Sequence, residues 1–205
     1  MTHEPEWQPR TDTARLLALS DGIFAVAMTL AAAQILPSDL GKRLYHEGSS
    51  AVLADLKPQF TGIALTFMLV GLYWMTHHRI FSYVRRTSQR FTTLNLFFLL
   101  GITLMPSAVQ FSSLPPSDVT AVVVYGAYVG GLGLLLALIW ESAVRGRLTD
   151  PHLDPRVVRY NRYRSLITAG VFLLSCPVAV AFGANAGRLT WLAVFFNGRI
   201  AKKLA

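Results

Sequence analysis

Charged residues and cysteine are both scarce in this sequence of 205 residues. Asp, Glu, Lys and Arg together make up 15% of the chain, whereas soluble domains carry about 25%. Together with a mean hydropathy of +0.43, this scarcity excludes an ordinary soluble domain and predicts an integral membrane protein. The single cysteine, Cys176, excludes an intrachain disulfide and a metal cluster built on cysteines.

The common signatures of enzymes are absent as well. The sequence contains no glycine-rich phosphate loop, no HExxH motif and no Gly-x-Ser-x-Gly elbow. His77 and His78 are adjacent, and neighbouring residues on a helix point about 100° apart, so they do not predict a shared metal site. We therefore expect neither an enzyme nor a bound cofactor or metal. The net charge of +8 does not predict a nucleic-acid partner, because the basic residues lie between apolar runs.

Six apolar runs predict one all-α domain over residues 1–205, a polytopic membrane protein with six transmembrane helices. Residues 1–14 are expected to form a cytoplasmic tail. The expected spans are residues 15–36, 58–78, 91–113, 117–141, 164–183 and 184–200. Residues 49–56 have apolar residues at helical spacing and predict a short amphipathic helix at the membrane interface.

Prolines and glycines mark particular runs. Pro106 and Pro177 fall late in the third and fifth runs and predict kinks there. The fourth run contains YGAYVGGLG, residues 125–133, which does not reproduce the TVGYG filter of potassium channels. These glycines instead predict close packing of helices.

The basic residues predict the topology. Six spans would place 15 of the 19 Lys and Arg residues on the side that holds both termini. By the positive-inside rule this side is the cytoplasm. An even number of spans is required for both termini to lie there, which supports the count of six.

The first run carries one ionisable side chain, Asp21. A carboxylate inside a span costs roughly 2.5–3.5 kcal/mol on insertion scales and therefore normally has a partner. The end of the second span and the start of the third lie at a similar expected depth. The polar network predicted there comprises Arg15, Ser20, Asp21, Trp74, His77 and Asn95. Such a network fixes helix packing; in the alternative, Asp21 or His77 titrates and carries protons.

The residues around Asp21 resemble a known family. RLLALSDG, residues 15–22, is similar to the RxxxFSD signature that opens the first helix of the transmembrane protein 175 family of potassium channels, with Leu19 in place of Phe. The HHR that follows Trp74, and the LN at the start of the third span, also resemble this family. The resemblance implies a prokaryotic member in the bacterial plasma membrane.

The resemblance further implies a homotetramer whose first helices line a central pore without a pore loop. The constrictions then fall on Val26, Leu30 and Ala33, with Thr29 adjacent. The spacing i, i+4, i+7 puts the three on one helix face, although the same spacing is also ordinary packing surface. The expected partners are K⁺ in transit, other monovalent cations, the lipid bilayer and further copies of the chain. Ala33 is small for such a ring, so modest preference for potassium over sodium is expected.

A second class of function stays open from the residues alone. A proton-coupled membrane transporter would use Asp21 and His77 as its relay, with the helices kinked at Pro106 and Pro177 as gates. It predicts pH-driven, saturable flux that is sensitive to Asp21→Asn. The channel hypothesis predicts instead that substitution of Leu30 changes conductance or ion preference.

Overall fold

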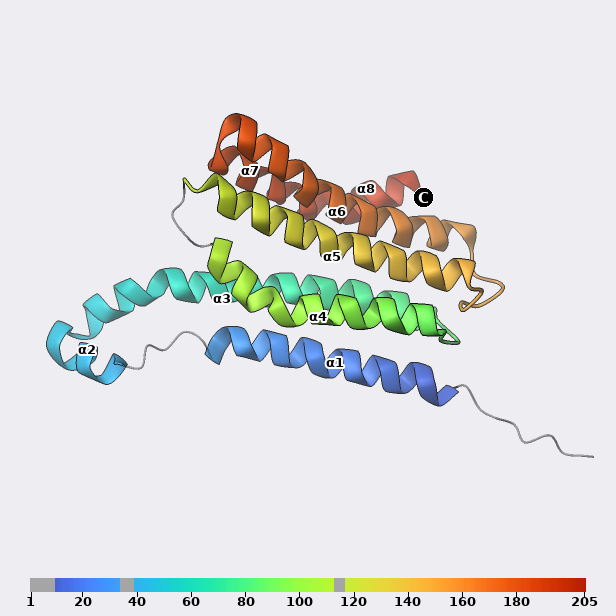
Figure 1. Cartoon of the computed structure of the whole chain (residues 1–205), viewed down its shortest axis with the longest axis horizontal. Coiled ribbons are helices and arrows are strands. Elements are labelled where there is room, and N and C mark those ends of the chain that lie inside the picture. The colour runs from blue at the N-terminus through green and yellow to red at the C-terminus, as the bar shows by residue number, and fades with distance from the viewer. Residues whose placement is uncertain (1–9, 34–38, 113–116) are drawn as a thin grey trace, which may run out of the picture.

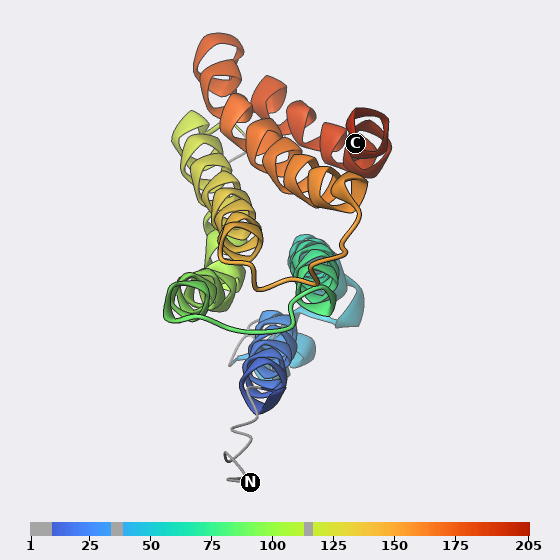
Figure 2. The same cartoon turned by 90° about the vertical axis from the view of Figure 1, so that its right-hand side faces the viewer.

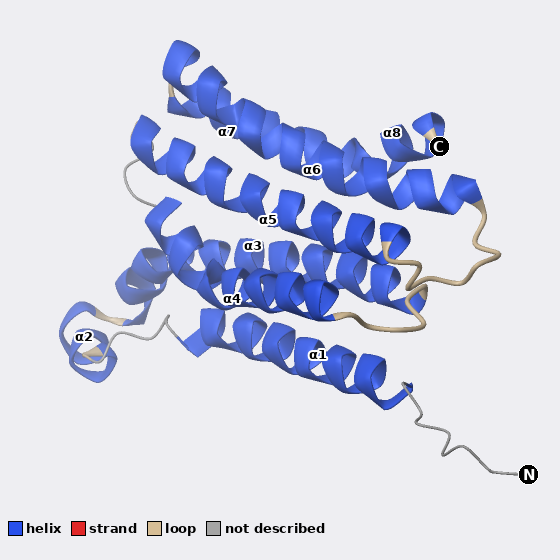
Figure 3. Ribbon diagram, turned by 45° about the vertical axis from the view of Figure 1, so that its right-hand side comes forward, coloured by secondary structure: helices blue, strands red, loops and turns tan. Residues whose placement is uncertain are grey.

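The computed structural model describes residues 10–33, 39–112 and 117–205, and these residues are almost entirely helical (Figures 1 and 3). The elements are α1 (Arg10–Ala33), α2 (Leu40–Glu47), α3 (Ser49–Ser82), α4 (Gln89–Ser112), α5 (Val119–Arg145), α6 (Pro155–Phe182), α7 (Ala184–Thr190), the 3-10 helix η1 (Trp191–Phe196) and α8 (Asn197–Leu204). Among the described residues the only β pairing is an isolated bridge between Val84 and Thr149. The all-α expectation is confirmed for this part of the chain.

Several helices are long and apolar enough to cross a membrane. The segments that meet this test are Thr13–Leu30, Gln89–Phe111, Val119–Arg145 and Pro155–Phe182. α3 has 34 residues, about 51 Å at 1.5 Å per residue, and therefore exceeds the ~30 Å of a hydrocarbon core. The chain is an all-α membrane protein, as its composition predicts.

The helices form a stack in which α1 lies at one edge. α1 packs against α3 and α4, α4 packs against α5, and α5 packs against α6. The segment from α7 to α8 returns along α6 and contacts it through all three of its parts. Figure 2 shows α1 at one extreme and α6 to α8 at the other. Only one side of α1 is therefore covered.

The contact between α5 and α6 depends on glycine, as the sequence predicts. A Cβ added at Gly126 would lie 2.9 Å from the Phe172 carbonyl oxygen, and one at Gly133 would lie 3.0 Å from Ala169 Cα. Side chains larger than hydrogen at these positions would push the helices apart. The glycines thus let the two backbones approach closely.

The helix bounds differ from the expected spans where polar residues extend a helix. α3 begins at Ser49 and runs without interruption, so residues 49–56 are its first turns and not a separate interfacial helix. α6 begins at Pro155, nine residues before the expected span, because Asp154 caps it by accepting from the Arg156 amide. α4 and α6 continue past Pro106 and Pro177. Residues 34–36, the end of the first expected span, lie outside the described part.

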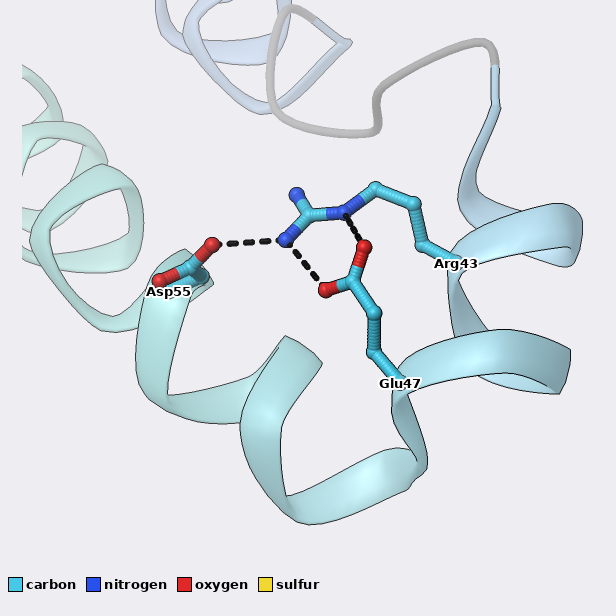
Figure 4. A network of polar contacts seen from close by, with 3 residues as sticks. All are labelled: Arg43, Glu47 and Asp55. Carbon is cyan, nitrogen blue, oxygen red and sulfur yellow. Dashed lines mark hydrogen bonds and ion pairs between the residues drawn. The ribbon is translucent and has the colours of Figure 1, made fainter.

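A charged hairpin precedes the long helix α3 (Figure 4). Arg43 of α2 forms ion pairs with Glu47 at 2.9 Å and with Asp55 of α3 at 2.6 Å. Gly48 joins the two helices with φ of +79°, a conformation that glycine adopts without steric cost. The hydrogen bond from Arg43 lowers the pKa of the Glu47 carboxyl below its ordinary value. The sequence analysis did not predict α2: residues 38–57 are too polar to span, and the amphipathic helix expected there covers only residues 49–56.

Candidate functional site: the open face of α1 and its polar contacts

α1 has one covered face and one open face. The covered face carries Ser20, Phe24 and Ala27, which are buried against α3 and α4. The open face carries Val26 and Leu30, whose exposed fractions are 54% and 41%. These two expected constriction residues therefore share a stripe that no other described helix of the chain covers.

Thr29 also lies on the open face. Its hydroxyl donates to the backbone carbonyls of Ala25 at 3.1 Å and Val26 at 2.9 Å. Because the proton is used within the helix, the hydroxyl oxygen keeps lone pairs that can accept from water or contact a cation. Ala33 is the last residue of α1, and the surroundings of its side chain lie outside the description.

Asn95 of α4 connects three helices on the covered side. Its Nδ2 donates to the Ser20 hydroxyl of α1 at 3.1 Å, and its Oδ1 lies 2.8 Å from His77 Nε2 of α3. Since Oδ1 can only accept, His77 carries its proton on Nε2 in this arrangement. Ser20 in turn donates to the Leu16 carbonyl at 2.8 Å. All three side chains of this Ser20–Asn95–His77 chain are fully buried.

Aromatic rings enclose His77. The imidazole stacks on Phe81 with ring centroids 4.2 Å apart and on Phe98 at 5.6 Å, and Phe24 of α1 lies at 5.4 Å. The sequence analysis missed this enclosure, although Phe81 follows His77 by four residues and Phe98 follows Asn95 by three. Both spacings place the pair on one helix face.

Asp21 is held separately. Trp74 Nε1 of α3 donates to Asp21 Oδ1 at 2.8 Å. Asp21 makes no hydrogen bond to Asn95 or His77, so the expected network consists of two separate connections between α1 and its neighbours. Arg15 is exposed and belongs to neither connection within the described part of the chain.

The arrangement fixes α1 without metal or charge pairing. The described residues contain no group of three His, Cys, Asp or Glu side chains that could hold a metal ion. The polar contacts from α1 to α3 and α4 are made by Ser20 and Asp21, and the stripe of Val26, Thr29 and Leu30 carries no charged side chain. The chemistry of α1 is therefore that of an anchored helix that presents an apolar surface.

Residues 15–106 match the family model described as "Endosomal/lysosomal potassium channel TMEM175". A potassium channel of Streptomyces collinus is 28% identical over 182 residues, which are 83% of this chain and 87% of that protein. A potassium channel of Chamaesiphon minutus is 26% identical over 202 residues, which are 96% of this chain and 97% of that protein. The chain is therefore similar to the TMEM175 family over its first half and to these bacterial channels over most of its length.

The fold is also similar to that of a solved structure. The crystal structure of a lysosomal potassium-selective channel TMEM175 homolog from Chamaesiphon minutus superimposes with a TM-score of 0.75 at 22% identity, covering 93% of this chain and 98% of that one. The endosomal/lysosomal proton channel TMEM175 of Mus musculus is 28% identical over 181 residues, but these are only 36% of its length. The matched family model and the bacterial relatives are described as ion channels and not as enzymes.

Proposed function

We propose that this chain is a TMEM175-type, potassium-permeable channel in a bacterial plasma membrane, with its pore on the open face of α1. One observation carries the proposal: α1 is anchored on one side by Ser20 and Asp21 and leaves Val26 and Leu30 uncovered on the other. Because the two bacterial relatives are named potassium channels, K⁺ is the ion proposed here.

One copy of α1 cannot enclose a pore. Repetition of the same helix around a rotation axis closes a ring, which is how homo-oligomers build symmetric channels. We infer a homotetramer of six-span subunits, with α1, α3, α4, α5, α6 and the α7–α8 segment as spans and both termini in the cytoplasm. The α7–α8 segment is a candidate sixth span because it returns along the length of α6.

The proposed constrictions act through size and wetting. Rings of Val26 and Leu30 offer no charge or carbonyl oxygen to replace the water around an ion, so they gate by dewetting. The Thr29 hydroxyl oxygen lies between these rings and can contact a passing cation. Without a charged side chain or a carbonyl filter, the preference for potassium over sodium is expected to be modest.

The test is ion flux from potassium-loaded liposomes. Leu30→Ala removes the side chain of one ring and should raise potassium flux or reduce the preference over sodium by about twofold or more. Leu174→Ala is the matched control, because Leu174 of α6 is also an exposed leucine, and its flux should equal that of the wild type. Equal flux through both variants and the wild type would place the pore elsewhere.

A proton-coupled transporter using Asp21 and His77 is the second candidate. Its support is that His77 Nδ1 is buried without a hydrogen-bond partner among the described residues and that the mouse relative is named a proton channel. Against it, Asp21 and His77 bond to different partners, and the Asn95 amide between His77 and Ser20 is a poor proton carrier. Proton flux that requires a pH gradient and disappears in both Asp21→Asn and His77→Gln would favour this candidate over the channel.

A further inference from the structure

A cavity lies among helices other than α1. It measures about 220 Å³ and is lined by residues of α3, α5, α6, η1 and α8. Figure 2 shows α6 and α8 at the opposite end of the stack from α1. Leu69, Leu72 and Val194 supply apolar walls, and Arg164 and Ser165 supply polar ones. None of the proposed constriction residues lines it.

Polar atoms at this cavity have no partner. Arg164 Nε, Ser165 Oγ and Asn197 Oδ1 are buried side-chain atoms that make no hydrogen bond in the part of the chain that the structure describes. Ser165 is 2% exposed and Asn197 is 6% exposed. A buried unsatisfied group costs about 1–3 kcal/mol, and native proteins leave few of them. Three such groups around one cavity indicate a polar occupant.

The cavity also carries positive charge without a counterion. Arg164 Nη1 donates to the Tyr160 hydroxyl at 2.8 Å, and Arg79 Nη1 donates to the same oxygen at 3.1 Å. No carboxylate of the described residues forms an ion pair with either arginine. Arg162, two positions away, does pair with Glu141 at 2.8 Å. The two guanidinium groups at Tyr160 therefore favour an anion.

Its position fits a lipid. Arg164 is the first residue of the span predicted over 164–183, at the end predicted to be cytoplasmic. Phe195, which also lines the cavity, is 64% exposed and connects the cavity to the apolar surface. α8 places the exposed side chain of Lys202 on the same segment as Asn197. Basic pockets between transmembrane helices on the cytoplasmic side bind anionic headgroups.

We propose that this cavity binds the headgroup of an anionic glycerophospholipid. The phosphate accepts hydrogen bonds from Arg164 Nε and the Ser165 hydroxyl, and a headgroup hydroxyl donates to Asn197 Oδ1. The acyl chains lie along Phe195 and the neighbouring apolar surface. A free glycerol phosphate offers the same polar chemistry without the chains, so the experiment has to separate the two sources.

Native mass spectrometry of the purified full chain, with phosphatidylglycerol titrated against a phosphatidylcholine background, measures this binding directly. Arg164→Gln should weaken phosphatidylglycerol binding about tenfold, since a hydrogen bond to a charged group is worth about 1.5–3 kcal/mol. Ser165→Ala should weaken it about threefold. Arg199→Gln removes a nearby exposed charge that does not line the cavity and should change the affinity less than twofold.

Gly198→Leu is the second variant, in case Arg164→Gln does not fold. A Cβ at Gly198 would lie 3.9 Å from both Arg164 Nη1 and the Tyr160 hydroxyl, so the larger side chain enters the cavity without touching backbone and keeps every polar group. It should also weaken phosphatidylglycerol binding. Binding that is equal in wild type and all cavity variants, or that shows no preference over phosphatidylcholine, would overturn the proposal.

Glycerol 1-phosphate is the soluble probe. If it binds in phosphatidylcholine alone as tightly as phosphatidylglycerol, the lipid assignment is overturned and the cavity is a site for a free phosphate ester. Weak or absent binding of this probe supports the lipid. Because the readout is lipid affinity and not flux, it is independent of whether α1 lines the pore.

Discussion

At the scale of single residues, Asn95 is the side chain on which the position of α1 depends. The Asn95 side-chain amide of α4 donates to Ser20 of α1 and accepts from His77 of α3, so it joins three helices. Two further contacts add to it, the Trp74–Asp21 hydrogen bond and the packing of Phe24 on His77. Removal of the amide therefore leaves His77 Nε2 without a partner and removes the donor to the Ser20 hydroxyl, which keeps its own bond to the Leu16 carbonyl.

Asn95→Leu should lower the free energy of unfolding by about 1–3 kcal/mol, the cost of leaving buried polar groups unsatisfied. Thr103→Val on the same helix is the control, because the Thr103 hydroxyl bonds only to the Leu99 carbonyl of its own helix; it should change the free energy by less than about 0.5 kcal/mol. Unfolding in a detergent titration, followed by circular dichroism, measures both. Equal stability of the two variants would show that Asn95 does not hold α1.

At the scale of helices, the α5–α6 pair shows how small residues determine packing. An added Cβ at Gly126 would lie only 2.9 Å from the Phe172 carbonyl oxygen, and one at Gly133 would make a tight contact of 3.0 Å with Ala169, whereas Gly131 has nothing within 4 Å of an added Cβ. The three glycines lie on one helix within eight positions. Substituting them by alanine therefore separates the steric effect of an added methyl group at a helix contact from its effect on helix propensity.

Gly126→Ala should destabilise the protein by about 1–3 kcal/mol, because the new methyl group overpacks the contact with Ser175 and Phe172. Gly131→Ala should be neutral or stabilising by up to about 1 kcal/mol, because alanine favours a helix over glycine. Thermal unfolding of both variants in the same detergent checks this. A loss of stability in Gly131→Ala as large as that in Gly126→Ala would contradict the proposed packing.

The sequence predicts the apolar centre of each long helix but not its full extent. A hydropathy pattern marks only the apolar part of a helix, whereas the helix itself extends as far as its backbone hydrogen bonds continue. For this reason α3 already begins at Ser49 and α6 at Pro155, before the apolar runs start. The residue types at the site of α1 are also predictable, because a carboxylate in a span needs a donor. The hydrogen-bond partner of Asp21 is not predictable from the sequence, because Trp74, His77 and Asn95 are all donors at a similar depth. Only the packing of α1 on α3 selects Trp74.

At the scale of the whole molecule, the open face of α1 is the surface that an assembly must cover. α1 lies at the edge of the stack and packs against α3 and α4 alone among its larger contacts. Leu19 on the same face is 48% exposed, so the uncovered stripe extends below Val26 towards the start of the helix. A ring of copies with this face inward would bring each residue of the stripe close to its equivalents.

Val26→Cys in a Cys176→Ala background should therefore yield cross-linked dimers with a short bifunctional maleimide in liposomes. Leu174→Cys, exposed on α6 far from α1, should yield few. Gel electrophoresis reads the product, and native mass spectrometry of the untreated protein should show four copies. Efficient cross-linking through position 174 but not through position 26 would reverse the proposed orientation of the subunit.

The Trp74–Asp21 contact has a consequence for biosynthesis. Trp74 follows Asp21 by 53 residues, and ribosomes add about 5–20 residues per second. For roughly 3–11 s after Asp21 is made, its partner has not yet been synthesised, and an unpaired carboxylate in a membrane span costs roughly 2.5–3.5 kcal/mol. α1 therefore has to wait near the translocon or at the membrane interface until α3 arrives, and the docking of the first helix is a late event in the maturation of each subunit.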